Sequence, residues 1–380
     1  MKIAVNTRLL IKNKLEGIGW FTYETLKRIV IQHPDVTFYF LFDRKPDHEF
    51  LFADNIKPIV LLPQARHPVL FYLWFEWSVP WILKKINPDL FLSPDGYISL
   101  STNIPTLAVI HDLNFEHFPK DLPPLVRRYY KHFFSRFARK ASRIGTVSSY
   151  SKKDIQESYG IEESKIDVIY NGVNEQFEPV DNDVITTTRA KYSGGKPYFL
   201  FVGSLHPRKN LARLFNAFDM FRTQSNYDIK LLVVGEKKWW TEPIRLAYEQ
   251  MTNKEHVIFS GRLNPMELRR VTASAFATTY VSYFEGFGIP IVESFKTGVP
   301  VITSNVTSMP EVAGDAALLV DPFSTKDIVS AMIKITEDET LRKTLITKGL
   351  ERCKMYTWQK SADRLWESIE KTIQTKTDNT

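Results

Sequence analysis

The hydrophobic positions of this chain form short apolar runs, separated by longer stretches in which apolar residues recur at helical spacing. Such runs indicate buried strands, and the amphipathic stretches between them indicate helices. The predicted strands are Lys2–Asn6, Thr37–Phe42, Ile59–Leu62, Leu90–Ser93, Thr106–His111, Arg143–Val147, Lys165–Ile169, Tyr198–Val202, Lys230–Gly235, Val257–Ser260, Ala275–Ser282, Val299–Thr303 and Ala317–Val320. The predicted helices include Gly19–Gln32, Leu125–Ala141, Asn210–Arg222 and Asn264–Thr272. This alternation predicts an α/β protein with doubly wound parallel sheets.

The strands fall into two series, which predict two Rossmann-like domains in a chain of 380 residues. The expected N-terminal domain spans residues 1–178, and a polar linker with a threonine run and two glycines follows at 179–196. The expected C-terminal domain spans 197–357. Residues 358–380 are expected to form a helix that packs back on the first domain, plus a tail. Ligands of such sheets bind at the carboxyl ends of the strands, so the expected site is a cleft between the domains.

Composition narrows the class of protein. The net charge of +7 favours anionic ligands or anionic surfaces. The one cysteine, Cys353, excludes an intrachain disulfide and suggests a reducing compartment. The opening residues Met1–Asn6 read as a strand rather than a signal peptide, and no apolar window is long enough to span a membrane. We find no metal-binding signature and no nucleic-acid module.

Two glutamates, Glu285 and Glu293, enclose the most informative segment, with glycines at 286 and 288 between them. The preceding residues predict a strand, and Ile289–Lys296 predicts a helix with Pro290 at its first position. A glycine loop leading to a helix N-terminus is suited to a phosphate or pyrophosphate. Glu293, in the first helical turn, is then expected to accept hydrogen bonds from a ribose diol, and Glu285 to point into the cleft. The alternative is a strand-to-helix turn with two solvated glutamates.

A second segment, Gly203–Asn210, carries Arg208 and Lys209 just before a helix for which Asn210 is a suitable N-cap. Two cations beside a helix terminus could hold a pyrophosphate whose charge grows as its bond to a sugar breaks. The alternative is a solvated basic turn.

Two further candidates lie in the first half of the chain. His111 ends a predicted strand and would sit at the cleft edge, with Asp112 orienting its ring. Gly17 and Gly19 follow the first strand and resemble a phosphate-facing turn, although the third glycine of the dinucleotide fingerprint is missing. For His111, the alternative to a place in the cleft is a purely structural role.

The stretch Leu125–Lys140 is basic and aromatic at helical spacing, and residues 71–77 with Trp81 add an aromatic cluster. A basic aromatic helix can lie on an anionic membrane. The alternative is that the aromatic side chains are core and the charges a solvated face.

Taken together, these segments resemble the retaining glycosyltransferases of the large family four, which have the GT-B fold and an E-x7-E motif. The resemblance covers nearly the whole chain and rests on the Glu285–Glu293 motif and on four further segments: Ile169–Val173, Gly203–Asn210, Val257–Leu268 and Ser308–Pro322.

The resemblance implies roles for particular residues. Arg208 and Lys209 would clamp the donor diphosphate, and Glu285 would contact the donor sugar. Glu293 would hold the ribose hydroxyls, and the backbone near Arg262 would meet the base. His111 would face the reacting sugar, and Gly17 and Gly19 would approach donor phosphate or acceptor. The remaining residues would contact the donor through their backbone: Gly203, Gly286, Phe287, Gly288 and Ile289. One departure is Ser204, where many members carry an arginine, so the clamp depends more on Arg208 and Lys209.

The sequence therefore predicts a metal-independent, retaining glycosyltransferase without a bound cofactor. The leading donor is GDP-mannose, and the expected acceptor is a glycan or a lipid-linked glycan in polysaccharide synthesis. The expected location is cytoplasmic, peripheral on the inner face of the membrane. A nucleotide-sugar epimerase of the same fold and a catalytically silent protein binding nucleotide-sugar or membrane are the alternatives.

Overall fold

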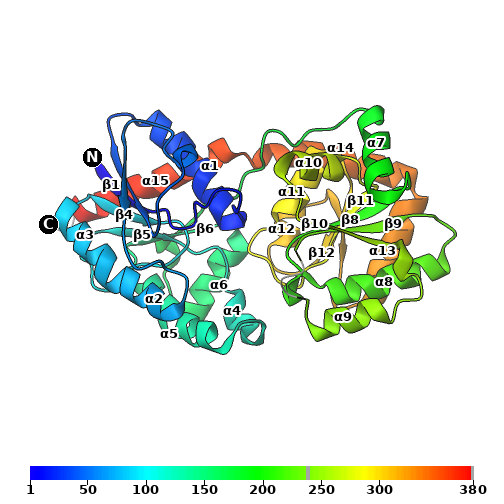
Figure 1. The fold of residues 1–380 in the computed structure, drawn as a ribbon, viewed down its shortest axis with the longest axis horizontal. Coiled ribbons are helices and arrows are strands. Elements are labelled where there is room, and N and C mark those ends of the chain that lie inside the picture. Colours follow the sequence, from blue (N-terminus) through cyan, green and yellow to red (C-terminus); the bar gives the residue numbers. More distant parts are fainter. Residues whose placement is uncertain (237–239, 378–380) are drawn as a thin grey trace. The chain divides into compact units, whose positions relative to one another are not determined.

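The computed structural model describes residues 1–236 and 240–377. The chain divides into two compact units (Figure 1): unit 1 comprises Met1–Gly172 and the chain from Trp358 onward, and unit 2 comprises Val173–Thr357. Within unit 2 the chain enters and leaves at neighbouring points, since Val173 forms a parallel bridge with Thr357 and its amide donates to the Tyr356 carbonyl at 3.1 Å.

Unit 1 contains a parallel sheet of seven strands in the order β3-β2-β1-β4-β5-β6-β7. The strands are β1 (Lys2–Asn6), β2 (Thr37–Phe42), β3 (Ile56–Val60), β4 (Leu90–Ser93), β5 (Thr106–Val109), β6 (Arg143–Thr146) and β7 (Ile166–Val168). The order reverses between β1 and β4, which makes this pair the switch point of the sheet.

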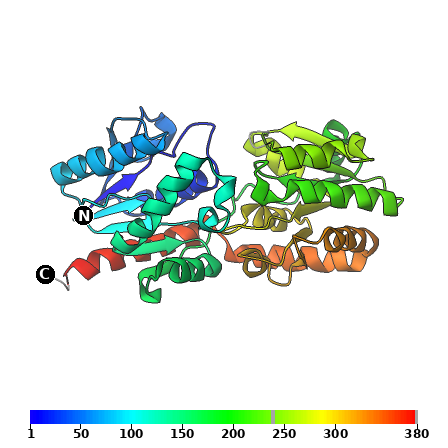
Figure 2. The same cartoon turned by 90° about the horizontal axis from the view of Figure 1, so that it is seen from below.

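Helices cover both faces of this sheet. They are α1 (Gly17–Gln32), α2 (Pro68–Leu73), α3 (Val79–Ile86), α4 (Asn114–His117), α5 (Pro124–Lys140), α6 (Ser149–Tyr159) and α15 (Trp358–Thr377), with short turns η1 (His48–Phe50), η3 (Pro119–Asp121) and η4 (Glu163–Lys165). A π-helical turn, η2 (Trp74–Ser78), joins α2 to α3. Apolar residues of α2, η2, α3, α5 and α6 pack in one core with one face of the strands. On the other face α15 lies against β4, β5 and β6 (Figure 2), and it also packs along α1.

Unit 2 contains a parallel sheet of six strands in the order β10-β9-β8-β11-β12-β13. The strands are β8 (Tyr198–Val202), β9 (Lys230–Val234), β10 (Val257–Gly261), β11 (Ala277–Tyr280), β12 (Val301–Ser304) and β13 (Ala317–Val320). Successive residues of β8 point to opposite faces, as a strand requires. Phe199 and Phe201 join one core, and Tyr198 and Leu200 join the other.

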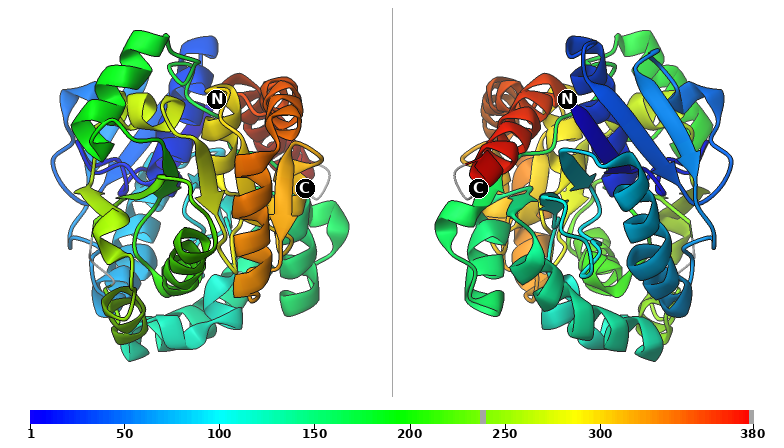
Figure 3. Two further views of the ribbon diagram at one scale, coloured as in Figure 1. Left: turned by 90° about the vertical axis from the view of Figure 1, so that its right-hand side faces the viewer. Right: turned by 90° about the vertical axis from the view of Figure 1, so that its left-hand side faces the viewer.

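The helices of unit 2 lie on both faces of its sheet (Figure 3, left). They are α7 (Asn182–Ser193), α8 (Leu211–Gln224), α9 (Glu242–Glu249), α10 (Pro265–Ala273), α11 (Ile289–Lys296), α12 (Met309–Ala313), α13 (Thr325–Glu337) and α14 (Glu339–Arg352), with short turns η5 (Pro207–Lys209), η7 (Lys254–His256) and η8 (Cys353–Met355). The predicted α/β class with two doubly wound parallel sheets is confirmed.

The predicted domain boundaries need correction. The expected linker at 179–196 contains helix α7, which belongs to unit 2 because Arg189 Nε donates to the Ser274 carbonyl at 3.0 Å and Lys191 pairs with Glu267 at 2.5 Å. The two glycines at its end cap the helix, and Gly194 adopts the left-handed conformation. The division between the units falls at Gly172–Val173 rather than at 178. Helix α15 lies in unit 1, and residues 378–380 of the predicted tail lie outside the described residues.

Strand ends are also shorter than predicted in places. The strand predicted at 275–282 spans Ala277–Tyr280, and the one predicted to end at His111 ends at Val109. No helix within the described ranges is long and apolar enough to cross a membrane.

Candidate functional site

Two chain segments meet at the switch point of the unit 2 sheet. Strands β8 and β11 are neighbours in the sheet although β9 and β10 lie between them in sequence, and each is followed by one of the two segments chosen from the sequence. The amide of Tyr283 donates to the carbonyl of Arg208 at 2.9 Å, which joins the two segments through the backbone. Ligands of doubly wound sheets bind at this position, outside the carboxyl ends of the strands.

The side chains of these segments form one ionic cluster. Glu285 Oε2 accepts from Arg208 Nη1 at 2.6 Å, and Glu285 Oε1 accepts from Lys209 Nζ at 2.6 Å. Lys209 Nζ also donates to the Tyr280 hydroxyl at 2.6 Å and lies 4.9 Å from the centre of that ring. Lys209, Glu285 and Tyr280 are buried. Two cations share one carboxylate, so the cluster keeps one positive charge.

The cluster fixes the ionisation of Glu285. Burial alone would raise the pKa of this carboxyl, but the charges and hydrogen bonds of Arg208 and Lys209 outweigh it and lower the pKa to about 2. Burial raises the pKa of the neighbouring Tyr280 hydroxyl well above its ordinary value, so the tyrosine stays neutral. Glu285 is therefore an ionised hydrogen-bond acceptor at any physiological pH.

Short polar side chains hold the backbone of this site. Asn210 has a left-handed conformation with φ of 61°, and its side-chain amide donates to the carbonyls of Val281 and Pro322 at 2.9 and 2.7 Å. Asn210 occupies the predicted N-cap position of α8, but its side chain does not cap the helix, because its Oδ1 accepts from Arg213 Nη1 at 2.8 Å. The Ser308 hydroxyl donates to the carbonyl of Glu285 at 2.9 Å. Nothing in the local sequence around Tyr280 or Ser308 pointed to these contacts.

Helix α11 begins one residue after Gly288, which has φ of 99°. A Cβ atom at Gly288 would lie 3.0 Å from Ile291 Cδ1 in a backbone conformation that L residues rarely adopt, so glycine is required here. Pro290 has no N–H and the Ile291 amide donates to the Gly288 carbonyl at 3.0 Å, so this terminus offers an anion the Ile289 amide and the positive end of the helix dipole. Pro290 occupies the second helical position rather than the predicted first.

Helix α11 has the predicted bounds, but Glu293 lies in its second turn rather than in the predicted first turn, which contains no acidic residue. Its carboxylate forms no hydrogen bond or ion pair with any residue in the described part of the chain, in contrast to Glu285. Burial raises the pKa of this carboxyl to about 7. An uncompensated, partly buried carboxylate is suited to accept hydrogen bonds from a ligand.

The other predicted donor-side residues of unit 2 lie at the same edge of the sheet. Gly203 directly follows β8 and packs against Gly235, which follows β9: a Cβ added at Gly235 would lie 1.9 Å from the Gly203 carbonyl oxygen. Ser204 and Arg262 are exposed, and Arg262 directly follows β10. Gly286, Phe287 and Gly288 are buried, and Ile289 is partly buried.

His111 lies in unit 1, two residues past the end of β5. Its Nε2 is 2.8 Å from the Pro94 carbonyl, and its ring packs edge-on against Phe21 with centroids 5.1 Å apart. Burial lowers the pKa of the imidazole, so the neutral form with a proton on Nε2 is favoured. Asp112 does not hydrogen-bond the ring as predicted, because its Oδ1 accepts from the Asn114 amide at 3.1 Å.

Gly17 and Gly19 lie in the first turn of α1, which begins earlier than the predicted Gly19. Gly17 is exposed, and a Cβ atom at Gly19 would lie 3.1 Å from Leu15 Cδ2. The two glycines therefore form a helix start rather than a separate turn.

A buried ion pair that the sequence did not indicate lies beside β1 and β4 in unit 1. Arg8 Nε donates to Asp95 Oδ2 at 2.7 Å, and its guanidinium lies 4.4 Å from the centre of the Tyr97 ring. Asn6 also donates to Asp95, at 2.8 Å. The pair joins the loops that follow the two strands at the switch point of this sheet.

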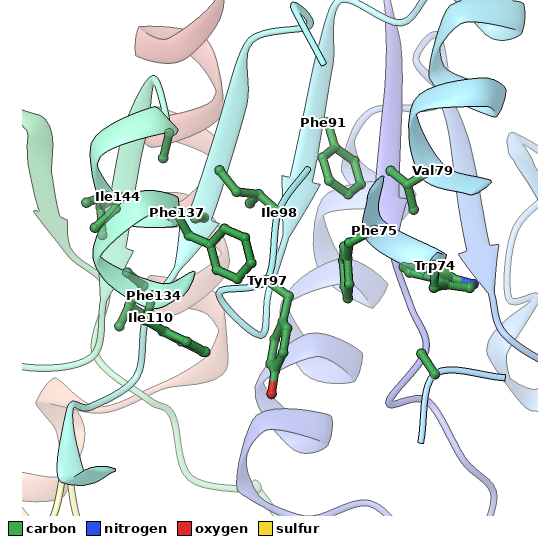
Figure 4. Close-up of a cluster of buried hydrophobic side chains, with 14 of the residues drawn as sticks. Trp74, Phe75, Val79, Phe91, Tyr97, Ile98, Ile110, Phe134, Phe137 and Ile144 are labelled. Atoms are coloured by element: carbon green, nitrogen blue, oxygen red, sulfur yellow. The ribbon is translucent and has the colours of Figure 1, made fainter. Parts of the chain in front are cut away.

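Helix α5 contains the basic aromatic stretch. Its rings at Phe134 and Phe137 are buried in the core of unit 1 (Figure 4), and so is that of Tyr129, whereas most of its basic residues are exposed. For these rings the alternative is confirmed, because they complete the core around Tyr97, and contact of this helix with a membrane stays a prediction.

Comparison with known proteins accounts for most of the chain. Residues 15–177 match the family model Glycosyltransferase Family 4, and residues 185–352 match the model Glycosyl transferases group 1. The chain is 26% identical to O-antigen chain mannosyltransferase B of Escherichia coli over 94% of its own length and 97% of that protein. It is also 26% identical to O-antigen chain mannosyltransferase RfbU of Salmonella typhimurium, over 71% of each chain.

Among solved structures, Anabaena Alr3699/HepE in complex with UDP and glucose superposes with a TM-score of 0.77 at 16% identity, covering 98% of this chain and 100% of that one. This likeness concerns the fold, and it confirms the predicted GT-B architecture of two Rossmann-like domains.

Proposed function

We propose that this chain, a glycosyltransferase with a family 4 domain followed by a group 1 domain, is a retaining hexosyltransferase that uses a nucleotide-diphosphate sugar. The leading donor is GDP-mannose, and the acceptor is a glycan or lipid-linked glycan of a cell-surface polysaccharide. The observation that carries the proposal is the cluster of Arg208, Lys209 and Glu285 at the switch point of unit 2, beside the start of α11. The relatives named as O-antigen chain mannosyltransferases support the choice of sugar and of pathway.

In this proposal the donor diphosphate binds between the two cations and the first turn of α11. The formal charge of Arg208, Lys209 and Glu285 together is positive, and the helix terminus adds a partial positive charge. Both stabilise the diphosphate as it leaves the sugar, which is where an enzyme of this kind needs stabilisation most. These groups take the place of a divalent ion, so we propose that the reaction needs no metal.

Glu285 is proposed to bind the donor sugar and not to attack it. Each of its oxygens is already bonded to a cation, and a carboxyl with a pKa of about 2 is a weak nucleophile and a weak base. Retention then follows if the acceptor hydroxyl attacks from the face that the diphosphate leaves, and the departing phosphate oxygen takes the proton. The protein has to orient the reactants and stabilise the leaving group.

Glu293 is proposed to accept hydrogen bonds from the ribose hydroxyls, because its carboxylate is otherwise unpaired. Arg262, after β10, is proposed to approach the base through its backbone. In unit 1, His111 is proposed to contact the reacting sugar through Nδ1, because Nε2 faces Pro94, and Gly17 and Gly19 to approach phosphate or acceptor. The protein is proposed to act in the cytoplasm, at the inner face of the membrane.

The decisive experiment incubates the purified protein with radiolabelled GDP-mannose, with and without a lipid-linked glycan extract and with EDTA. We expect label to move to the glycan, with retention of the anomeric configuration and no loss in EDTA. A changed sugar without an acceptor would indicate an epimerase, and neither transfer nor hydrolysis with any nucleotide sugar would indicate a silent binding protein.

A further inference from the structure

A continuous helix on the surface of unit 1 has one apolar side in the core and a second apolar side in solvent. It runs through α2, the π-helical turn η2 and α3, over residues 68–86. Trp74, Phe75 and Val79 point into the core (Figure 4). The outward side carries Val69, Tyr72, Trp77 and Trp81, which are 57%, 45%, 68% and 62% exposed. Trp77 and Trp81 are the most exposed tryptophans of the described chain.

The π-helical turn explains how these four side chains share one side. A π-helix bonds i to i+5 and has a wider turn than an α-helix. Tyr72 and Trp77 are five residues apart, so the wide turn brings them into line, and Trp81 follows one ordinary turn later. A regular α-helix would rotate Trp77 away from Tyr72. Turns of this kind often mark functional positions.

The segment before the helix extends the apolar surface. Leu62, which is 71% exposed, is held beside the π-helical turn because the Ser78 hydroxyl donates to its carbonyl. The indole of Trp74 donates to the neighbouring Leu61 carbonyl at 3.2 Å. We call the exposed side chains of Leu62, Val69, Tyr72, Trp77 and Trp81 the aromatic face.

Basic residues border the aromatic face. Helix α5 packs against α2, and the Phe133 ring lies 6.0 Å from that of Tyr72. Helix α5 carries six basic residues and no acidic one: Arg127, Arg128, Lys131, Arg136, Arg139 and Lys140. At the other end Lys85 Nζ lies 5.6 Å from the Trp81 ring. The one acidic residue of the long helix, Glu76, accepts from the Leu100 amide at 2.7 Å.

We infer that the aromatic face inserts into the interface of an anionic lipid bilayer, with the basic side of α5 against the lipid headgroups. Tryptophan and tyrosine prefer the boundary between headgroups and acyl chains. Exposed apolar side chains bordered by cations match the chemistry of an anionic membrane surface. The inference rests on the proposed function, because a lipid-linked acceptor requires a protein that works at a membrane.

The charge pattern favours a bilayer over a second copy of this chain. A two-fold dimer through the aromatic face would place the same patch on both subunits. Two α5 helices without acidic residues would then lie near each other, and like charges oppose such an interface.

Vesicle flotation tests the inference without measuring sugar transfer, so its result is independent of the proposed function. The wild type is compared with Trp77→Ala/Trp81→Ala, with Arg128→Glu/Lys131→Glu, and with a control, Tyr227→Ala/Met266→Ala, which removes exposed apolar side chains of unit 2. Vesicles contain phosphatidylcholine alone or equal amounts of phosphatidylcholine and phosphatidylglycerol. Circular dichroism checks that each variant is folded, and light scattering gives its oligomeric state.

We expect the wild type and the control to float with anionic vesicles. The tryptophan variant should bind vesicles at least about tenfold more weakly than the wild type. The affinity of the charge-reversal variant should fall about fivefold for each substituted residue, and only for anionic vesicles. Tryptophan emission of the wild type should shift to the blue on binding. Flotation of the folded tryptophan variant at the wild-type level would overturn the inference. So would a wild-type dimer that the tryptophan variant converts to a monomer without change in vesicle binding.

Discussion

The two ends of the segment Glu285–Glu293 place the same chemical group in opposite environments. At the loop end, Glu285 is bonded to two cations and has a pKa of about 2. At the helix end, Glu293 has no partner in the described chain, and burial raises its pKa to about 7. The first carboxylate is stabilised by the protein before any ligand arrives, and the second is destabilised until a ligand supplies hydrogen bonds. A difference of this kind separates a group that maintains a site from a group that recognises a ligand.

The largest expected effect comes from removing the paired carboxylate. Glu285→Gln removes the carboxylate that both Arg208 and Lys209 contact in a largely buried cluster, and we expect the free energy of unfolding at pH 7 to fall by about 3–5 kcal/mol. The pKa of Glu285 is about 2 in the folded protein, below its ordinary 4.5, so its contribution is present above pH 4.5 and is lost as the pH falls toward 2. Urea denaturation at pH 7 and pH 4 measures the effect.

The matched control is Glu267→Gln, which removes a half-exposed carboxylate that contacts Lys191 and the Tyr192 hydroxyl and should cost no more than about 1 kcal/mol. Equal stability of Glu285→Gln and Glu267→Gln would contradict the structural role of the cluster.

The second expected effect is on turnover. Lys209→Ala removes a cation from the proposed diphosphate site, and we expect kcat to fall about 100- to 1,000-fold. Stability should change less than in Glu285→Gln, because Glu285 keeps its bond to Arg208 at 2.6 Å. Steady-state transfer from GDP-mannose measures the loss, with Lys191→Ala as the control. A folded Lys209→Ala protein with normal turnover would refute the assigned role.

The smallest expected effect is on the unpaired carboxylate. The pKa of Glu293 in the folded protein is about 7, above its ordinary 4.5, so ionisation makes the wild type less stable as the pH rises through this window. Glu293→Gln removes that cost, and we expect it to be more stable than the wild type by about 1–2 kcal/mol at pH 8 and equal to it below pH 4.5. The expected gain in stability is kept small because part of the Glu293 side chain reaches solvent.

The same Glu293→Gln variant should bind GDP about tenfold more weakly at pH 8, because an amide is a poorer acceptor for ribose hydroxyls than a carboxylate. Thermal unfolding and isothermal titration calorimetry measure the two effects. Unchanged GDP affinity would contradict the assignment of Glu293 to the ribose. The contrast between a carboxylate that maintains the site and one that binds the ligand would then fail.

Much of the fold could be predicted because buried parallel strands have a strong local signal. The strands Lys2–Asn6, Thr37–Phe42 and Tyr198–Val202 have the predicted bounds, since each is a short, mostly apolar run followed by a polar residue or a glycine. The segment 179–196 was misread because its polar composition is also that of a helix exposed on one side. Its helical packing depends on Ser274 and Glu267, which are far away in the sequence.

The candidate site, like the fold, could be predicted only in part. Arg208, Lys209, Glu285 and Glu293 could be chosen from their spacing around strand ends and helix starts. The bonds of Glu285 to both cations could not be predicted. Lys209 and Glu285 are 76 residues apart, and their contact depends on β8 and β11 being neighbours in the sheet. Arg8 and Asp95 were missed for the same reason, and Tyr280 was missed because a tyrosine within an apolar strand looks like ordinary core.

The parallel bridge between Val173 and Thr357 has a consequence for engineering. Unit 2 is one uninterrupted segment whose first and last residues lie side by side, whereas unit 1 is made of two segments that need each other, since α15 covers β4, β5 and β6. A donor-binding cassette from another enzyme could therefore be inserted through two adjacent junctions. Truncation before Trp358, in contrast, would strip one face of the other sheet.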